Sequence, residues 1–270
     1  MIKLIAIDID GTLLNSQHRL TQKVIETIKS AKAQGVKIVL CTGRPIVGIL
    51  PYLEKLDLLD STDIAITQNG ALVQETASKK VLSHLTIELE QLKEIEKFSK
   101  TQKAQLTFFD DKKMYTLHPE PNKLLFDDAK LLHTELTLID KVDLSSDMLL
   151  TKAMFLGDST EIDQLLLDLP PSFYDEFYCV RSVSYNFEFL NRGASKGEAL
   201  KVLAESLNLN PENVMAIGDA ENDRSMLEYA GSAVVMENAL LEIQALATFV
   251  TKSNDNDGVA FAIEELVLTK

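Results

Sequence analysis

Two aspartates interrupt an apolar run near the start of the chain. Residues 2–9 are mostly Ile, Leu and Ala, which predicts a short strand buried on both faces, and this run carries Asp8 and Asp10 at its end, followed by Gly11. A buried carboxylate is costly unless its charge is compensated, and a hard divalent cation such as Mg2+, which prefers oxygen ligands, would compensate it. Gly11 allows a sharp turn that exposes backbone N–H groups to an anion. The alternative is a strand that ends in an Asp-rich turn with no chemistry.

Polar residues also follow three other apolar runs, and one lysine opens a helical pattern. These residues are Thr42, Gly43 and Arg44 after the run 36–41, Asn69 after 64–67, Lys196 beside 197–207, and Asp219, Asn222 and Asp223 after 214–217. If residues 219–223 open a helix, its acidic and amide side chains share one side of the first turn, where free N–H groups favour an anion. Plainer interpretations exist: Asn69 can simply make a turn, Lys196 can be a solvated lysine, and the aspartates can cap a helix.

The elements expected around these residues place them at one edge of a parallel sheet. Residues 21–34 have helical spacing, with Thr21 as the N-cap. This helix lies between two apolar runs, so the first two strands form a βαβ unit and run parallel. Parallel strands end at the same edge, and open α/β sheets bind ligands there. We therefore expect Asp8, Asp10 and Thr42 to lie close together.

The pattern changes between about residues 82 and 189. Helical stretches alternate there with runs suited to antiparallel strands, and the last run places Tyr185, Phe187 and Phe189 on one side. The expected helices are 86–100 and 121–133, and the expected strands are 105–109, 113–117, 150–156 and 183–190. The sequence thus predicts an α/β fold. Its Rossmann-like core comprises residues 1–81 and 190–270, with a parallel sheet flanked by helices, and residues 82–189 form an inserted α+β domain.

The remaining core elements are expected on both sides of the inserted segment. On the N-terminal side, residues 45–59 are expected to form a helix that Pro51 kinks or breaks. On the C-terminal side, apolar strands and amphipathic helices alternate again. The expected elements there are helices at 197–207, 225–230, 240–247 and 258–268 and strands at 214–217, 233–236 and 249–251.

Composition narrows the class of protein. The chain has 270 residues, 46% of them hydrophobic and 25% charged, and a formal charge of −14, as an ordinary globular protein can have. An acidic chain without a basic stripe is not expected to bind nucleic acid. The same charge would repel an anionic substrate at long range, so local cations such as Arg44, Lys196 and a metal ion must receive one.

The sequence also indicates the cellular compartment of the protein. Cys41 and Cys179 form neither a disulfide framework nor a metal-ligand spacing. No apolar run approaches the roughly 18 residues of a membrane span, and the N-terminus lacks a signal-peptide pattern. We therefore expect a cytoplasmic protein with no membrane partner, and the sequence does not indicate its oligomeric state.

Taken together, the polar stretches resemble the motifs of the haloacid-dehalogenase (HAD) superfamily. Asp8-Ile9-Asp10-Gly11-Thr12-Leu13-Leu14 resembles the D-x-D-G-T-L-[LV] opening, Thr42-Gly43-Arg44 the second motif, Lys196 the third, and Gly218-Asp219-Ala220-Glu221-Asn222-Asp223 the G-D-x-x-N-D fourth motif. The likeness covers essentially the whole chain and is to phosphatases of the Cof type, whose large α/β cap is inserted between the second and third motifs. One departure is Arg224, where relatives usually carry an apolar residue, and it leaves the implied chemistry unchanged.

This resemblance implies a Mg2+-dependent phosphatase acting on small phosphorylated metabolites, such as sugar phosphates. Asp8 would be the nucleophile that forms an aspartyl-phosphate, and Asp10 would protonate the leaving group and then deprotonate water. The implied metal ligands are Asp8, Asp219 and the backbone carbonyl of Asp10, with Asp223 supporting, and the implied phosphate-binding groups are Thr42, Gly43, Lys196 and Asn222. Arg44 is not part of this set, and Asn69 is expected either to make a turn or to contact the substrate. The inserted domain would be a cap that excludes water and reads the leaving group.

Two other functions stay open at this point. A phosphomutase of the same superfamily would return the phosphoryl group to a second hydroxyl, although the mutases that we would compare usually carry a smaller helical cap. A non-catalytic protein would bind a phosphorylated ligand, or would carry a regulatory phosphate on Asp8. Asp10 disfavours this second alternative, because an adjacent acid/base promotes turnover of a phosphoaspartate.

Overall fold

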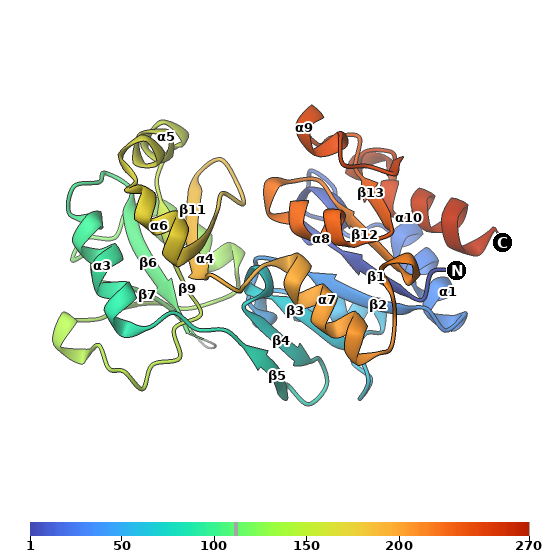
Figure 1. Ribbon diagram of the computed structural model, residues 1–270, viewed down its shortest axis with the longest axis horizontal. Helices are drawn as coiled ribbons and strands as arrows, with labels where there is room; N and C mark the ends of the chain where they lie inside the picture. Colours follow the sequence, from blue (N-terminus) through green and yellow to red (C-terminus); the bar gives the residue numbers. More distant parts are fainter. Residues whose placement is uncertain (111–112, 270) are drawn as a thin grey trace. The chain divides into compact units, whose positions relative to one another are not determined.

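The computed structural model describes residues 1–110 and 113–269, which divide into two compact units. Unit 1 consists of Met1–Ser83 and Ser195–Lys270, and unit 2 is the intervening segment His84–Ala194. Each unit has its own sheet and its own helices (Figure 1). The sequence predicted an inserted domain at residues 82–189, and the role of this segment as a cap stays a prediction.

The sheet of unit 1 has eight strands in the order β14-β13-β12-β1-β2-β3-β4-β5. Pairing is parallel from β14 through β12 and β1 to β3, and β4 returns antiparallel to β3. The strands are β1 Leu4–Ile7, β2 Lys37–Cys41, β3 Ile64–Thr67, β4 Leu72–Glu75, β5 Val81–His84, β12 Val214–Gly218, β13 Ser232–Val235 and β14 Phe249–Val250. The predicted α/β class with a mainly parallel sheet is confirmed.

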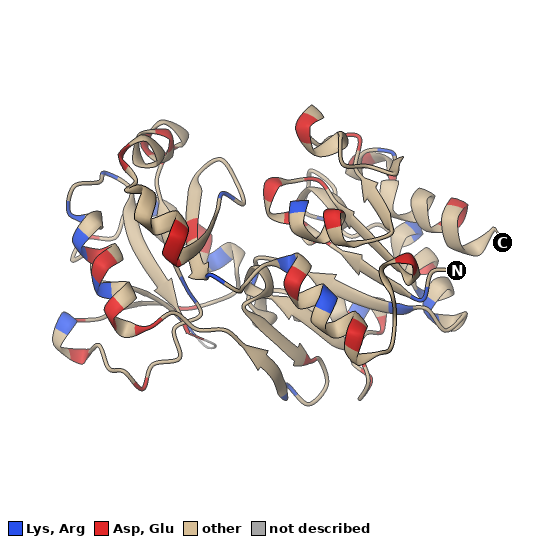
Figure 2. Ribbon diagram, in the orientation of Figure 1, with Lys and Arg blue, Asp and Glu red and all other residues tan. Residues whose placement is uncertain are grey.

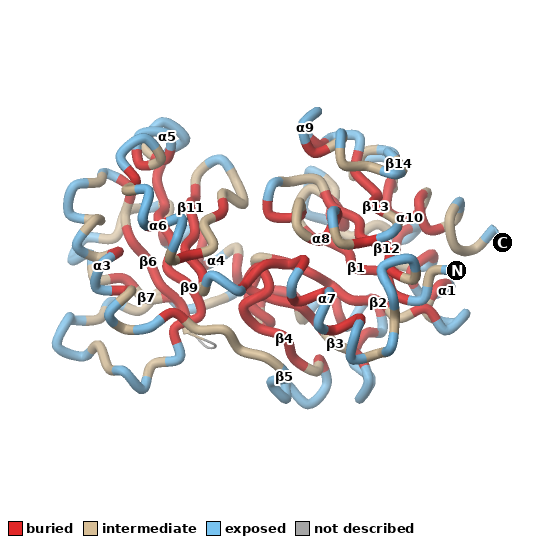
Figure 3. The backbone as a smooth tube through the Cα atoms, in the orientation of Figure 1, coloured by how far each residue is buried: buried red, intermediate tan, exposed pale blue. Residues whose placement is uncertain are grey.

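Helices pack on both faces of this sheet, because successive residues of a strand point to opposite faces. They are α1 Gln22–Ala33, α2 Leu50–Leu56, α7 Lys196–Ser206, α8 Arg224–Tyr229, α9 Leu241–Gln244 and α10 Gly258–Ile263. In β1, Ile5 and Ile7 pack with residues of α1 and α10, whereas Leu4 and Ala6 pack with residues of α7 and α8. The central strands are buried (Figure 3). Asp8 continues the alternation on the side of α7, which positions it for contact with that helix.

Unit 2 is an α+β unit built on a six-stranded sheet, in the order β10-β11-β9-β6-β7-β8. Its strands are β6 Gln105–Phe109, β7 Met114–Thr116, β8 Leu136–Leu138, β9 Lys152–Leu156, β10 Phe177–Val180 and β11 Asn186–Asn191. Its helices are α3 Leu89–Ser99, α4 Lys123–Leu131, α5 Ser159–Asp168 and α6 Pro171–Glu176. Phe187 and Phe189 share one core cluster, with ring centroids 5.2 Å apart. Tyr185, which was expected beside them, precedes β11 and packs against a different cluster.

An ion pair lies inside unit 2. Lys152 of β9 and Glu188 of β11 are 2% and 1% exposed, and Lys152 Nζ lies 2.7 Å from Glu188 Oε2. The Ser182 hydroxyl donates to the other carboxylate oxygen, Oε1, at 2.5 Å. Two charges buried in this way need each other, because removing one partner leaves the other uncompensated.

Pro51 has a different role from the one expected. The helix expected over 45–59 is instead a short turn, η2 Ile46–Gly48, followed by α2, and Pro51 lies in the first turn of α2. Proline is tolerated there because first-turn N–H groups have no acceptor within the helix. It therefore begins the helix and does not kink it. By contrast, Thr21 caps α1 as predicted, since its hydroxyl oxygen accepts the Val24 N–H at 3.2 Å.

Several elements were not predicted. These are the β4–β5 strands of unit 1 and, in unit 2, β8, β10, α5 and α6. The helix expected over 240–247 is shortened to α9, and the one expected over 258–268 is α10 followed by a π-helical turn, η8 Glu264–Leu268. β8 and β10 are short and only partly buried, so they lack the continuous apolar signal that marked the central strands.

Charges of both signs alternate along the exposed helices of each unit, for example on α3 and α7 (Figure 2). In α3, Lys93 Nζ lies 2.6 Å from Glu90 Oε1, three residues away. Exposed pairs of this kind contribute little to stability. Among the helices within residues 1–110 and 113–269, none has the length and apolar character that a bilayer span requires.

Candidate active site

Polar residues follow the carboxyl ends of neighbouring parallel strands in unit 1. Asp8 follows β1, Thr42 follows β2, and Asp219 follows β12. β1 lies between β2 and β12, and the chain builds the sheet outward in opposite directions from this point. A crevice forms at such a reversal of strand order, and open α/β sheets bind ligands in it. Asp8, Thr42 and Asp219 therefore lie at the sheet edge where the sequence predicted them.

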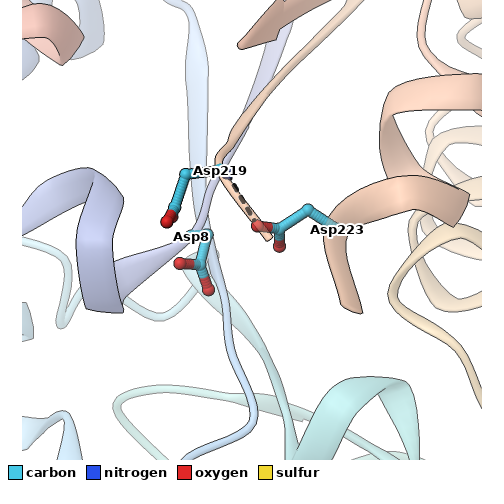
Figure 4. A group of neighbouring side chains, drawn as sticks. All are labelled: Asp8, Asp219 and Asp223. Carbon is cyan, nitrogen blue, oxygen red and sulfur yellow. Dashed lines mark hydrogen bonds between the residues drawn. The ribbon is translucent and has the colours of Figure 1, made fainter. Parts of the chain in front are cut away.

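Three carboxylates meet at this edge. One carboxylate oxygen each from Asp8, Asp219 and Asp223 lies within 4.8 Å of the other two, and Figure 4 shows the Asp8 and Asp219 carboxyl groups next to each other. Burial, and then the charges of Asp223 and other neighbouring aspartates, raise the pKa of Asp8 well above its usual range, although Lys196 opposes this. Burial and the charge of Asp223 likewise raise the pKa of Asp219, to about 7. These carboxylates fit a hard divalent cation, which would offset their repulsion.

Lys196 is the cation that the chain itself supplies. It is the first residue of α7 and is fully buried. Its Nζ donates to Asp8 Oδ1 and to Asp223 Oδ1, both at 2.6 Å. Burial lowers the pKa of Lys196, but the charges of Asp223 and Asp8 more than offset this and leave the pKa above its usual value. The ammonium group is therefore charged, and it fixes the Asp8 carboxylate through one oxygen.

Asp223 is engaged through both of its carboxylate oxygens. Oδ1 accepts from Lys196, and Oδ2 accepts the backbone N–H groups of Asp219 at 2.9 Å and Ala220 at 3.0 Å (Figure 4). Asp219 precedes the helical turn η6 Glu221–Asp223 and is not part of it. The condition that residues 219–223 together open a helix is therefore not met, and Asp219 is instead joined to Asp223 by its backbone N–H.

Asp10 is paired with Arg44, a contact that the sequence analysis did not foresee. Asp10 lies in the turn η1 Ile9–Leu13, where its own backbone is extended and not helical. Its two oxygens accept from Arg44 Nε at 2.7 Å and Nη2 at 2.5 Å. Arg44 is 3% exposed, and a two-pronged bond of this kind fixes the plane of a carboxylate. The signal in the sequence was an arginine three residues after the end of a buried strand, in a protein that needs local cations.

Thr12 was also missed, although it belongs to the opening motif. Its hydroxyl donates to Asp219 Oδ1 at 2.6 Å, and the side chain is 1% exposed. Gly11, next to it, has φ +81°, and a Cβ built there would lie 2.3 Å from Asp219 Oδ2. Glycine is required at this position for both reasons. The loop after β1 and the loop after β12 are thus closely packed around Asp219.

The remaining predicted residues lie in the loops beside this cluster. Thr42 is buried, and its hydroxyl oxygen accepts the Arg44 N–H at 3.1 Å. Asn222 Nδ2 donates to Asn69 Oδ1 at 3.1 Å, so Asn69 contacts a predicted phosphate-binding residue. Gly43 faces the same asparagine, since a Cβ built on Gly43 would lie 3.0 Å from Asn69 Nδ2.

Known proteins resemble the whole chain. The model of the haloacid dehalogenase-like hydrolase family matches residues 5–263. The Bacillus subtilis protein named "Putative phosphatase YxeH" is 40% identical over 270 residues, which is 100% of both chains. A solved haloacid dehalogenase-like hydrolase from Bacteroides thetaiotaomicron has a TM-score of 0.86 at 28% identity, covering 98% of this chain and 100% of that one. The solved HAD subclass IIB sugar phosphatase BT4131 has a TM-score of 0.83 at 25% identity, covering 97% of this chain and 98% of that one.

Proposed function

The chain belongs to the haloacid dehalogenase-like hydrolases and is a phosphoric monoester hydrolase; from this we propose that it hydrolyses small phosphorylated metabolites, such as sugar phosphates, with Mg2+ and through an aspartyl-phosphate. The observation that carries the proposal is the meeting of Asp8, Lys196 and Asp219, from distant parts of the chain, at one sheet edge. The solved sugar phosphatase supports the substrate class. The Cof-type assignment and a cytoplasmic location belong to the same proposal.

The donor set suits Mg2+. Asp8 and Asp219 would hold the ion through carboxylate oxygens and Asp10 through its backbone carbonyl, whereas Asp223 would support the site, since both of its oxygens already accept hydrogen bonds. The raised pKa values of Asp8 and Asp219 reflect burial and repulsion that a cation would offset. When bound, Mg2+ would neutralise phosphoryl charge and align the phosphate with the attacking carboxylate.

Asp8 would act as the nucleophile. Among the described residues, only the Lys196 side chain donates to its carboxylate, through Oδ1, which leaves Oδ2 to attack phosphorus. An Asp8–phosphorus bond would form as the bond from phosphorus to the leaving oxygen breaks, and Asp10 would give that oxygen a proton. Arg44 donates to both Asp10 oxygens, and one of these bonds has to open when Asp10 carries the proton.

The second step would release phosphate. Asp10 would take a proton from water while the water oxygen attacks phosphorus and the bond to Asp8 breaks, which regenerates the free carboxylate. Thr42, the Gly43 amide, Lys196 and Asn222 would hold the phosphoryl oxygens throughout. Thr42 fits this role because its oxygen accepts from Arg44, so its own hydrogen is left as a donor.

The test is hydrolysis of p-nitrophenyl phosphate and of a panel of phosphorylated metabolites, with Asp8→Asn compared with wild type. We expect the variant to lose at least about a thousandfold in kcat, in the range seen when a nucleophile is removed. EDTA should silence the wild type and Mg2+ should restore it. Wild-type protein quenched during turnover of labelled substrate should contain a hydroxylamine-labile phosphoryl label, and Asp8→Asn should contain none.

Asp57→Asn is a matched control, because Asp57 is exposed and has φ +59°, a conformation that asparagine tolerates. It should be as active as wild type. Near-native turnover by Asp8→Asn with an unchanged circular dichroism spectrum would remove Asp8 as the nucleophile. Full activity after exhaustive chelation would remove the metal from the proposal.

A further inference from the structure

Three consecutive residues in the turn after β3 have a left-handed backbone. Gln68, Asn69 and Gly70 have φ values of +51°, +53° and +94°. Glycine adopts this conformation freely, but two neighbouring residues with side chains adopt it only where the surrounding structure enforces it. The turn is also buried, with Gln68 1% and Asn69 0% exposed. The turn Gln68–Gly70 is thus strained, buried and polar, and strain of this kind is often found at functional sites.

The backbone of this turn joins two segments of the site. The Gln68 N–H donates to the Arg44 carbonyl at 3.1 Å, and the Asn69 N–H donates to the Thr42 carbonyl at 2.9 Å. On its other side, a Cβ built on Gly70 would lie 2.1 Å from the carbonyl oxygen of Ser195, the residue before Lys196. The turn is therefore packed between the loop after β2 and the start of α7.

The side chain of Asn69 adds a third connection. Asn222 Nδ2 donates to Asn69 Oδ1 at 3.1 Å, and Gly43 lies against the same amide group. Asn222 and Gly43 come from opposite ends of the sequence, and both belong to the phosphate-binding set of the proposed function. Among the described residues, no other side chain forms a hydrogen bond with the Asn222 amide.

We propose that Asn69 is a positioning residue for the phosphoryl group: its side chain fixes the Asn222 amide and the Gly43 segment at the separation that the phosphoryl oxygens require. The proposal rests on the proposed function. A turn-forming role alone would also suit asparagine, which adopts positive φ more readily than most residues. The two roles differ in what glycine would do, because glycine keeps the backbone conformation and removes only the amide.

Asn69→Gly is therefore the test. We expect kcat/KM for a metabolite identified in the panel to fall by about tenfold or more, and the inhibition constant of orthophosphate to rise several-fold, with the thermal midpoint near wild type. Asn208→Gly is the matched control, because Asn208 has φ +55°, is exposed and follows the far end of α7. It should change neither kinetic constant.

A double-mutant cycle with Asn222→Ala separates positioning from general loss of order. If Asn69 acts through Asn222, the second substitution costs less in the Asn69→Gly background than in wild type. Additive losses would overturn the proposal, and so would wild-type kinetics and orthophosphate inhibition in Asn69→Gly, which would leave Asn69 a turn-forming residue. If the wild type hydrolysed no phosphate ester, the proposed function would fall, and orthophosphate binding measured by calorimetry on the same variants would still decide the role of Asn69.

Discussion

Removing one charge from the acidic cluster should stabilise the metal-free protein. Burial and the charge of Asp223 raise the pKa of Asp219 from 3.8 to about 7, so between these pH values the folded protein retains a proton that the unfolded chain has lost. The stability contributed by this group is therefore complete at about pH 4 and is lost as the pH rises towards 7. We predict that Asp219→Asn raises the free energy of unfolding at pH 8, because the amide is neutral and its Oδ1 can still accept from Thr12.

The size of the effect follows from the pKa. The pKa of Asp219 rises by about three, and at ~1.36 kcal/mol for each unit of pKa the upper value of the effect is about 4 kcal/mol. Asp219 is partly exposed, and solvent screens part of the repulsion, so we expect a gain of about 2 to 4 kcal/mol at pH 8 and little gain near pH 4. Urea unfolding in EDTA, followed by far-UV circular dichroism, is the assay, since the chain has no tryptophan.

Asp255→Asn is a control of opposite sign. The exposed Asp255 carboxylate accepts from the Ser16 hydroxyl and N–H, which lower its pKa, so losing its charge should lower stability at pH 8. Saturating Mg2+ should shrink or reverse the gain in Asp219→Asn, because the ion would bind the folded wild type more tightly. If metal-free Asp219→Asn were no more stable than wild type at pH 8, the reasoning that this cluster carries uncompensated charge would be refuted.

Two further predictions concern ion pairs, one partly exposed and one buried. Arg44→Lys should slow hydrolysis of an alkyl ester such as glycerol phosphate by about tenfold, and hydrolysis of p-nitrophenyl phosphate far less. Lysine cannot bond both Asp10 oxygens in one plane, and only the poorer leaving group, the alkoxide, depends on a proton from Asp10. Equal losses of rate on the two substrates would contradict this prediction. Lys152→Met should lower the free energy of unfolding by about 3 kcal/mol, measured in urea, because it leaves Glu188 buried without a cation. The double variant Lys152→Met/Glu188→Gln should recover part of that loss. An unchanged urea midpoint in Lys152→Met would contradict the prediction.

The sequence was informative where local pattern and topology determine position. Asp8 and Asp219 could be placed at one edge because each follows an apolar run, and parallel strands end on the same side. Lys196 was placed near them by the likeness to the family motifs, because its position at the start of a helix also suits a solvated lysine. Burial on both faces gave the central strands a continuous apolar signal that short or edge strands lack.

Contacts between loops were beyond such reasoning. Asp10 and Arg44 are 34 residues apart, and no periodicity indicates that one bonds both oxygens of the other. The bond from Thr12 to Asp219 spans 207 residues and depends on the close approach that Gly11 allows. Asn69 likewise suits an ordinary turn, and no pattern in the sequence indicates that its amide meets that of Asn222. Each of these contacts is set by how irregular segments pack, which propensity does not describe.

Charge balance in the site gives an order to the proposed binding events. With Asp8, Asp219 and Asp223 ionised, Lys196 offsets one of three negative charges, and a net charge of −2 is left at the sheet edge. The Asp10–Arg44 pair is neutral as a unit. A phosphate dianion entering this cluster would be repelled at close range in a poorly solvated site. Under the proposed function, one Mg2+ would bring the cluster to neutrality and leave Lys196 and the amide and hydroxyl donors to hold the phosphoryl oxygens. The metal would then have to bind before the substrate or together with it.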